Sequence, residues 1–158
     1  MNIWVAIFLF LHVMGAIIAF GPSYSFPIIG KMASQEPQHA NFAARLNEAI
    51  TEQRIIPLAI FQGITGAALI IVTGINLFAT KWLLLGIALW VVALGYGLFV
   101  QGPVGRRIVE LTSTPPPPGA SGPPPELMAN IQKAQRGGII LGLLIVAIVI
   151  LMVTKPQF

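Results

Sequence analysis

The sequence predicts an all-α membrane protein, a single domain over residues 1–158 built as a four-transmembrane-helix bundle with a short amphipathic interfacial helix and a Pro-rich loop. Two observations support this fold class. Hydrophobic residues make up 56% of the chain and charged residues only 9%, too few to cover a soluble globule. Four apolar runs approach the length of about 20 residues that a helix needs to cross a bilayer. The predicted spans cover residues 3–20, 55–78, 82–100 and 138–153.

The first predicted span, Ile3 to Phe20, contains one ionisable side chain, His12. At about 1.5 Å per residue, His12 falls near the middle of the bilayer. No basic residue precedes the run, and the run is longer than the apolar core of a signal peptide, so we expect an uncleaved span. Gly21 and Pro22 follow directly, and this X-Pro step predicts the end of the helix.

Residues 40–54 predict a short amphipathic helix in the first long connection. Phe42 and Leu46 fall on one face of this helix, and Arg45 and Glu48 fall on the other. Such a helix is expected to lie in the membrane interface. The alternative is a solvated helix that packs on the protein's own spans.

The second and third predicted spans each carry a stripe of small and polar residues. Spacings of three and four residues place them on one helical face, which is typical of helix packing in lipid. We expect both stripes to form helix interfaces and the third span to pack against the second. A ligand-lining face is the alternative for the second span. The predicted helix-packing residues are Gln62, Gly66, Thr73 and Asn76 in the second span, and Gly86 and Gly97 in the third.

The second long connection contains two proline runs, at residues 115–118 and 123–125. This composition favours polyproline II and does not form a core, so it predicts either a spacer or a docking arm. A helix is expected to start at Pro125 and Glu126. The fourth span is apolar on nearly every side, which predicts that it faces lipid or an apolar partner.

The distribution of basic residues predicts the topology. Most lie in the two long connections, and only Lys81 and Lys155 lie on the opposite side. We therefore expect a plasma (inner) membrane protein with both long loops in the cytoplasm and both termini outside. The net charge of +4 then indicates contact with anionic lipid, and no nucleic-acid partner is expected. The basic residues of the connections are Lys31, Arg45, Arg54, Arg106, Arg107, Lys133 and Arg136.

Several kinds of chemistry lack the residues they need. The chain contains no cysteine and no aspartate, and all five glutamates lie outside the apolar runs. The sequence therefore offers no thiolate nucleophile and no carboxylate pair at membrane depth. It also offers no His/Glu cluster with metal-ligand spacing. We predict no catalytic residue and no metal site.

His12 is the residue most suited to carry chemistry, and three interpretations remain open. The first is a structural imidazole that hydrogen-bonds a carbonyl or a side chain such as Thr65. The second is an axial ligand of haem b. The other histidine, His39, lies in a loop, so the sixth ligand would have to come from elsewhere. The third is a proton relay.

Three short motifs stand out: Leu11-His12-Val13-Met14-Gly15-Ala16, Gln62-x-x-Thr65-Gly66 and Met152-Val153-Thr154-Lys155-Pro156. Together they resemble a family of predicted integral membrane proteins of unknown function that have four helices. More distantly, the first helix is similar to that of the bacterial membrane protoporphyrinogen oxidases, whose histidine is thought to bind haem b. This chain lacks the basic residue that those enzymes carry within the membrane. The resemblance therefore implies a role for His12 alone.

These features predict a non-catalytic accessory subunit that contacts the lipid bilayer and other membrane protein subunits. No cofactor is expected in that case. The alternative is a membrane redox protein that binds haem b through His12.

Overall fold

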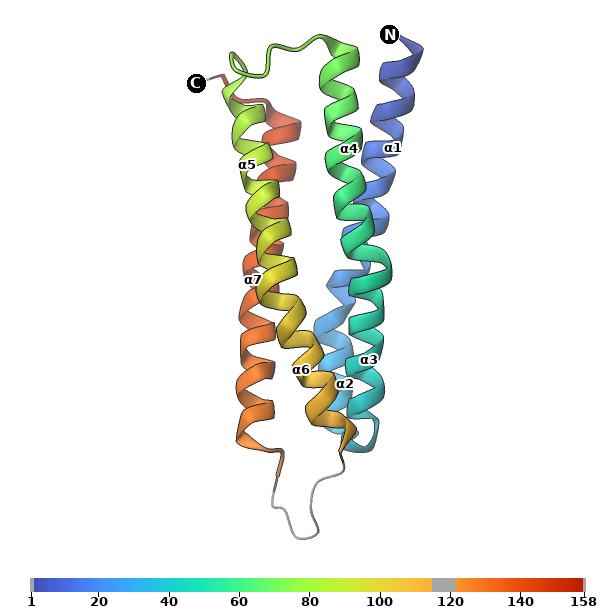
Figure 1. Ribbon diagram of the computed structural model, residues 1–158, viewed down its shortest axis with the longest axis vertical. Helices are drawn as coiled ribbons and strands as arrows, with labels where there is room; N and C mark the ends of the chain where they lie inside the picture. Colours follow the sequence, from blue (N-terminus) through green and yellow to red (C-terminus); the bar gives the residue numbers. More distant parts are fainter. Residues whose placement is uncertain (1, 115–121, 158) are drawn as a thin grey trace.

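The computed structural model describes residues 2–114 and 122–157, and within these residues every regular element is a helix. The chain forms four long helical columns that run side by side (Figure 1). They comprise Ile3–Gln35, Pro37–Thr73, Lys81–Ser113 and Pro125–Thr154. The all-α, four-helix fold class is therefore confirmed. The first proline run predicted as a spacer or docking arm, residues 115–118, lies outside the described residues.

Short segments of 3₁₀ or π helix divide three of the columns into separate α-helices. The first column contains α1 (Ile3–Phe20) and α2 (Phe26–Gln35), and the second contains α3 (Ala40–Ile50) and α4 (Ile56–Thr73). The third contains α5 (Lys81–Tyr96) and α6 (Gly102–Ser113), and the fourth is the single helix α7 (Pro125–Thr154). A 3₁₀ turn joins α1 to α2, and π-helical turns at Thr51–Ile55 and Gly97–Gln101 join the other pairs.

All four columns are longer than a bilayer requires. Their 30 to 37 residues correspond to about 45–55 Å, whereas the hydrocarbon layer is about 30 Å thick. Each column has a polar side chain, or the end of its first helix, at about the same height along the bundle. These positions are, in chain order, Phe20-Gly21, Arg54, Gln101 and Arg136. We call the helical region beyond this level the extramembrane layer; it comprises residues 21–54, 101–114 and 122–136.

The segment predicted as an interfacial helix belongs to the extramembrane layer. Residues 40–54 are helical, as expected, but they continue through the π-helical turn into α4 (Figure 1). The structure thus favours the alternative, a helix packed on the protein itself. Asn41 shows this packing, because its side-chain amide donates to the carbonyl of Val109 at 3.1 Å and to the hydroxyl of Thr112 at 3.2 Å.

Ion pairs connect the columns within the extramembrane layer. Arg106 on α6 lies 3.4 Å from Glu52, next to α3. Arg107 binds Glu126 at the start of α7, with Nη2 2.7 Å from Oε1, and also pairs with Glu110 on its own helix. Two of the basic residues and three of the five glutamates of the chain take part in these pairs.

Inside the membrane the four helices associate mainly as two pairs. Helix α1 packs along α4, and α5 packs along α7 (Figure 1). The third span contacts the second, as expected, but its main neighbour is the fourth span. The main bridge described between α4 and α5 is Trp90, whose indole nitrogen donates to the carbonyl of Ala59 at 3.0 Å. Its ring lies on Gly63, where an added Cβ would be 2.6 Å away.

The second transmembrane helix ends at Thr73, five residues before the predicted limit of the span. Gly74 adopts the left-handed conformation, with φ of 65°, and its N–H bonds to the carbonyls of Ile70 and Ile71. Such a C-terminal glycine stops a helix efficiently. Asn76 then stabilises the turn to α5, because its side-chain oxygen accepts hydrogen bonds from the N–H groups of Phe78 and Ala79.

Candidate functional site

His12 lies on the face of α1 that contacts α4. Its Nδ1 atom is 2.8 Å from the hydroxyl oxygen of Thr65, so the hydrogen bond predicted between these two side chains is present. Thr65 is buried, with 2% of its surface exposed. A polar contact of this kind favours one register of the two helices, because no water is available inside the bilayer to replace it.

The hydrogen bonds of Thr65 indicate how the His12 ring is protonated. The Thr65 hydroxyl lies 3.0 Å from the carbonyl of Phe61 and 3.2 Å from that of Gln62, and it has one proton to donate. When that proton goes to the backbone, His12 Nδ1 must be the donor to the hydroxyl oxygen. The second ring nitrogen, Nε2, then carries a lone pair.

Gln62 makes a second bond between the same two helices. Its side-chain amide donates to the backbone carbonyl of His12 at 2.8 Å, and only 5% of the residue is exposed. The amide approaches α1 directly over Gly15, where an added Cβ would lie 2.6 Å from Nε2 of Gln62. Gly15 is therefore needed for this close contact.

Each of the two helices places a polar side chain against a glycine of the other helix. Gln62 of α4 lies on Gly15 of α1, and His12 of α1 lies on Gly66 of α4, where an added Cβ would be 3.4 Å from Cε1 of the imidazole. We call His12, Thr65, Gln62, Gly15 and Gly66 the His12 cluster. It joins α1 to α4 near the middle of the membrane.

The other predicted packing residues have different surroundings. Thr73 is exposed and its hydroxyl bonds to the carbonyl of Leu69 on its own helix. Asn76 lies in the turn after α4. Gly86 on α5 is buried against Met152 of α7, whereas no described atom lies within 4 Å of a Cβ added at Gly97. The structure thus brings only Gln62 and Gly66 of this set together with His12.

Two close contacts were not identified in the sequence. Gly15 follows His12 by three residues and shares its helical face, a spacing that indicates a packing position once His12 is known to face a helix. Gln101 donates from its side chain to the carbonyl of Ala134 at 3.0 Å, and it lies on Gly137 of α7. Nothing in the local sequence relates Gln101 to a residue 33 positions away.

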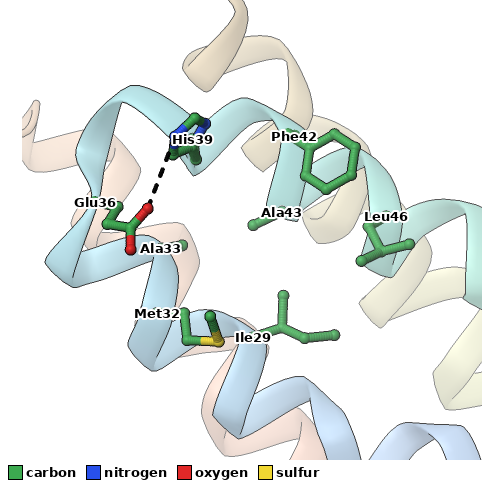
Figure 2. A pocket seen from close by; sticks show the side chains of 8 residues that line it. All are labelled: Ile29, Met32, Ala33, Glu36, His39, Phe42, Ala43 and Leu46. Atoms are coloured by element: carbon green, nitrogen blue, oxygen red, sulfur yellow. Dashed lines mark ion pairs between the residues drawn. The ribbon is translucent and has the colours of Figure 1, made fainter.

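A second candidate site is a groove in the extramembrane layer, between α2 and α3. Figure 2 shows apolar side chains from both helices facing one another across it, with Glu36 and His39 at the end where the helices are joined. Glu36 and His39 are 3.7 Å apart. The groove has a volume of about 330 Å³ and is lined by Ile29, Met32, Ala33, Glu36, His39, Phe42, Ala43 and Leu46.

The two candidate sites contain few ionisable side chains. The His12 cluster contains one imidazole and no carboxylate, and the groove contains one imidazole beside one carboxylate on an open surface. Among residues 2–114 and 122–157, no three His, Cys, Asp or Glu side chains are placed to hold a metal ion. His39 lies in the extramembrane layer, so His12 and His39 do not face a common cofactor.

Comparison with known proteins agrees with the fold and the composition. The family described as "Predicted integral membrane protein (DUF2269)" matches residues 6–156. Neither the curated proteins nor the solved structures provide a match. Because the family match covers nearly the whole chain, this protein belongs to that family of predicted integral membrane proteins.

Proposed function

We propose that the protein is a non-catalytic accessory subunit of a larger membrane assembly, and that a helix of a neighbouring subunit binds the groove between α2 and α3. The observation that carries this proposal is the exposure of large apolar side chains in the groove. Met32 is 58% exposed and Phe42 is 62% exposed. Exposed apolar patches of this kind mark interaction sites in soluble regions of proteins.

The position of the groove argues against lipid as its cover. Ile29 follows the end of α1 by nine residues and Leu46 precedes Arg54 by eight, so both lie about 12 Å beyond the hydrocarbon layer. The headgroup region adds only about 5–8 Å on each side. Without a partner, these side chains would face water, at a cost of about 25 cal/mol for each Å² of apolar surface.

The chemistry of the groove indicates what kind of helix would fill it. Apolar side chains line its length, which suits an amphipathic helix with anchors at three- and four-residue spacing. Glu36 closes one end with 56% of its side chain exposed, and His39 is the other ionisable residue among those that line the groove. A lysine or arginine in the partner helix would complement Glu36.

Purification in mild detergent tests the accessory role. We expect a partner at fixed stoichiometry, identified by mass spectrometry, and we expect Met32→Asp to release it. The control is Ile28→Asp, because Ile28 is 63% exposed on the same helix but does not line the groove. Migration of the wild-type chain alone, or equal loss of the partner in both variants, would contradict the proposal.

The orientation in the membrane forms part of the same proposal. We infer that the extramembrane layer faces the cytoplasm and that both termini lie outside a plasma (inner) membrane. The two termini lie at the same end of the molecule (Figure 1), and seven of the nine basic residues lie at the other. The positive-inside rule supports this orientation.

We propose haem b binding as a second candidate function. What supports it is the hydrogen bond between Thr65 and Nδ1 of His12, because a ligating histidine usually donates its other ring N–H to a neighbouring oxygen. Nε2 would then hold the iron, and haem would supply electron transfer. His39 is too remote to serve as the opposite ligand.

The visible spectrum of the purified protein tests this second candidate. Expression with added haem should give a Soret band that disappears in His12→Ala and remains in His39→Ala. The Thr65→Val variant should retain the band but shift the reduction potential, since Thr65 orients the ligand. Absence of the band in the wild-type protein would rule out haem binding and leave the accessory role intact.

A further inference from the structure

The end of the molecule opposite the extramembrane layer contains a second hollow, between the turn that precedes α5 and the segment that follows α7. It has a volume of about 300 Å³. By the same length argument that defines the extramembrane layer, this hollow lies at the other membrane surface. Its lining residues are Ile75, Ala79, Thr80, Lys81, Trp82, Lys155, Pro156 and Gln157.

Two lysines give this hollow a positive charge that no acidic side chain offsets. Lys81 begins α5, and Lys155 follows α7. All five acidic residues of the chain, Glu36, Glu48, Glu52, Glu110 and Glu126, belong to the extramembrane layer, about 30 Å away across the membrane.

The local backbone holds Lys155 over the hollow. Lys155 is the only described non-glycine residue with positive φ, 43°, a conformation that a lysine rarely adopts. Its ammonium group lies 5.9 Å from the centre of the Trp82 ring, within range of a cation–π contact. The turn at the end of α7 therefore places this charge over Trp82, in the hollow that Lys81 also lines.

The start of α5 adds hydrogen-bond donors to the same place. Thr80 is the N-cap residue, but its hydroxyl donates to the carbonyl of Asn76 at 2.7 Å and makes no capping bond. The N–H groups of Leu83 and Leu84 bond to the carbonyl of Thr80, whereas those of Lys81 and Trp82 have no acceptor among the described residues. Free N–H groups at a helix start favour anions, and phosphate in particular.

From these observations we propose that the hollow formed by Lys81, Trp82, Lys155 and the start of α5 binds an anionic phosphate group. A phospholipid headgroup and a soluble phosphate share this chemistry. The position of the hollow at the membrane surface, with Trp82 at headgroup level, favours a negatively charged lipid such as phosphatidylglycerol.

Native mass spectrometry of the full chain in neutral detergent tests the proposal. The probes are dioctanoyl phosphatidylglycerol, dioctanoyl phosphatidylcholine and inorganic phosphate, each added alone. We expect the phosphatidylglycerol to bind about tenfold or more tightly than the phosphatidylcholine, because two lysines contribute to binding. The double variant Lys81→Gln/Lys155→Gln should lose this preference, and Lys81→Arg/Lys155→Arg should keep it.

The matched control is Lys31→Gln/Lys133→Gln, which removes the same charge from exposed positions in the extramembrane layer. It should bind phosphatidylglycerol as the wild-type chain does. The site holds a soluble phosphate if two results are obtained together. Inorganic phosphate must bind in a manner that requires Lys81 and Lys155, and phosphatidylglycerol must not bind. The proposal is overturned if neither probe binds, or if Lys81→Gln/Lys155→Gln binds both as the wild type does while its circular dichroism shows an intact fold.

Discussion

Two polar side chains of the His12 cluster, His12 and Gln62, each lie on a glycine of the opposite helix. This exchange lets α1 and α4 approach closely enough for His12 and Gln62 to reach partners on the neighbouring helix. In lipid, each such hydrogen bond contributes about 0.6–2 kcal/mol to helix association, and close packing at small residues contributes further van der Waals attraction. The cluster therefore explains why an ionisable residue is tolerated in an otherwise apolar span.

We predict that Thr65→Val lowers the stability of the protein by about 1–2 kcal/mol, because His12 loses the partner of its Nδ1 atom. Thr73→Val is the control: Thr73 is exposed and bonds only to its own helix. Thermal unfolding in one detergent measures both. Equal melting temperatures for the two variants would show that the bond between Thr65 and His12 does not stabilise the fold.

Glu48 in the extramembrane layer provides a pH-dependent prediction. Burial, and secondarily the nearby charge of Glu52, raise the pKa of the Glu48 carboxyl above its ordinary value, and one carboxyl oxygen is buried without a partner among the described residues. A raised pKa means that the folded state binds the proton more tightly than the unfolded state. The contribution of Glu48 to stability is therefore present at low pH and is lost as the pH rises through the folded-state pKa.

Glu48→Gln should remove this dependence, since glutamine resembles the protonated carboxyl. We expect the variant to gain stability relative to wild type as the pH rises above the ordinary glutamate pKa, with no gain below it. Glu110→Gln serves as the control, because Glu110 is exposed. Chemical unfolding in detergent at a series of pH values measures the difference. A constant difference across the series would contradict the account.

The sequence identified part of the His12 cluster and could not identify the rest. An ionisable residue in an apolar run is visible at once, and Gln62, Thr65 and Gly66 fall at matching depth on the second span. Gly15 was missed because a glycine in a membrane helix has many explanations until its neighbour is known. The groove was missed because it needs the α2–α3 hairpin, which local periodicity does not reveal.

Helices α4 and α5 follow one another in the chain, yet inside the membrane the contact described between them depends largely on Trp90. The sequence could not predict this arrangement, because a stripe of small residues fits any neighbouring helix equally well. Gln62 and Gly66 of the α4 stripe pack on α1, and Gly86 of α5 packs on α7. Helix number and approximate limits follow from hydropathy, but helix partners depend on side-chain fit in three dimensions.

The contact between Trp90 and Gly63 gives a prediction for this junction. Gly63→Ala should destabilise the protein by about 1–3 kcal/mol, because the new methyl group would lie 2.6 Å from the indole ring. Gly142→Ala should be neutral or stabilising by up to about 1 kcal/mol, because no described atom lies within 4 Å of its Cβ and alanine favours a helix. Thermal unfolding in detergent compares them, and similar destabilisation in both would refute the packing of Trp90 on α4.

At the scale of the whole molecule, the bundle extends beyond the membrane on one side only. Ion pairs and the bonds of Asn41 hold α3, α6 and the start of α7 together in that extension. Reporter fusions test the orientation of the bundle. A reporter that is active only outside the cytoplasm should be active when fused after Phe158, and a reporter that is active only in the cytoplasm should be active when inserted after Gly122. A cytoplasmic signal from the fusion after Phe158 would reverse the proposed topology.

The central claim, that the α2–α3 groove binds a helix of another membrane subunit, is tested most directly by photo-crosslinking in cells. Benzoylphenylalanine replaces Phe42, which lines the groove, or Tyr24, an equally exposed aromatic residue of the same layer that does not. We predict one discrete protein adduct from position 42, mapped by mass spectrometry to an amphipathic helix with a basic residue, and none from position 24. Adducts to lipid alone, or the same adducts from both positions, would contradict the account.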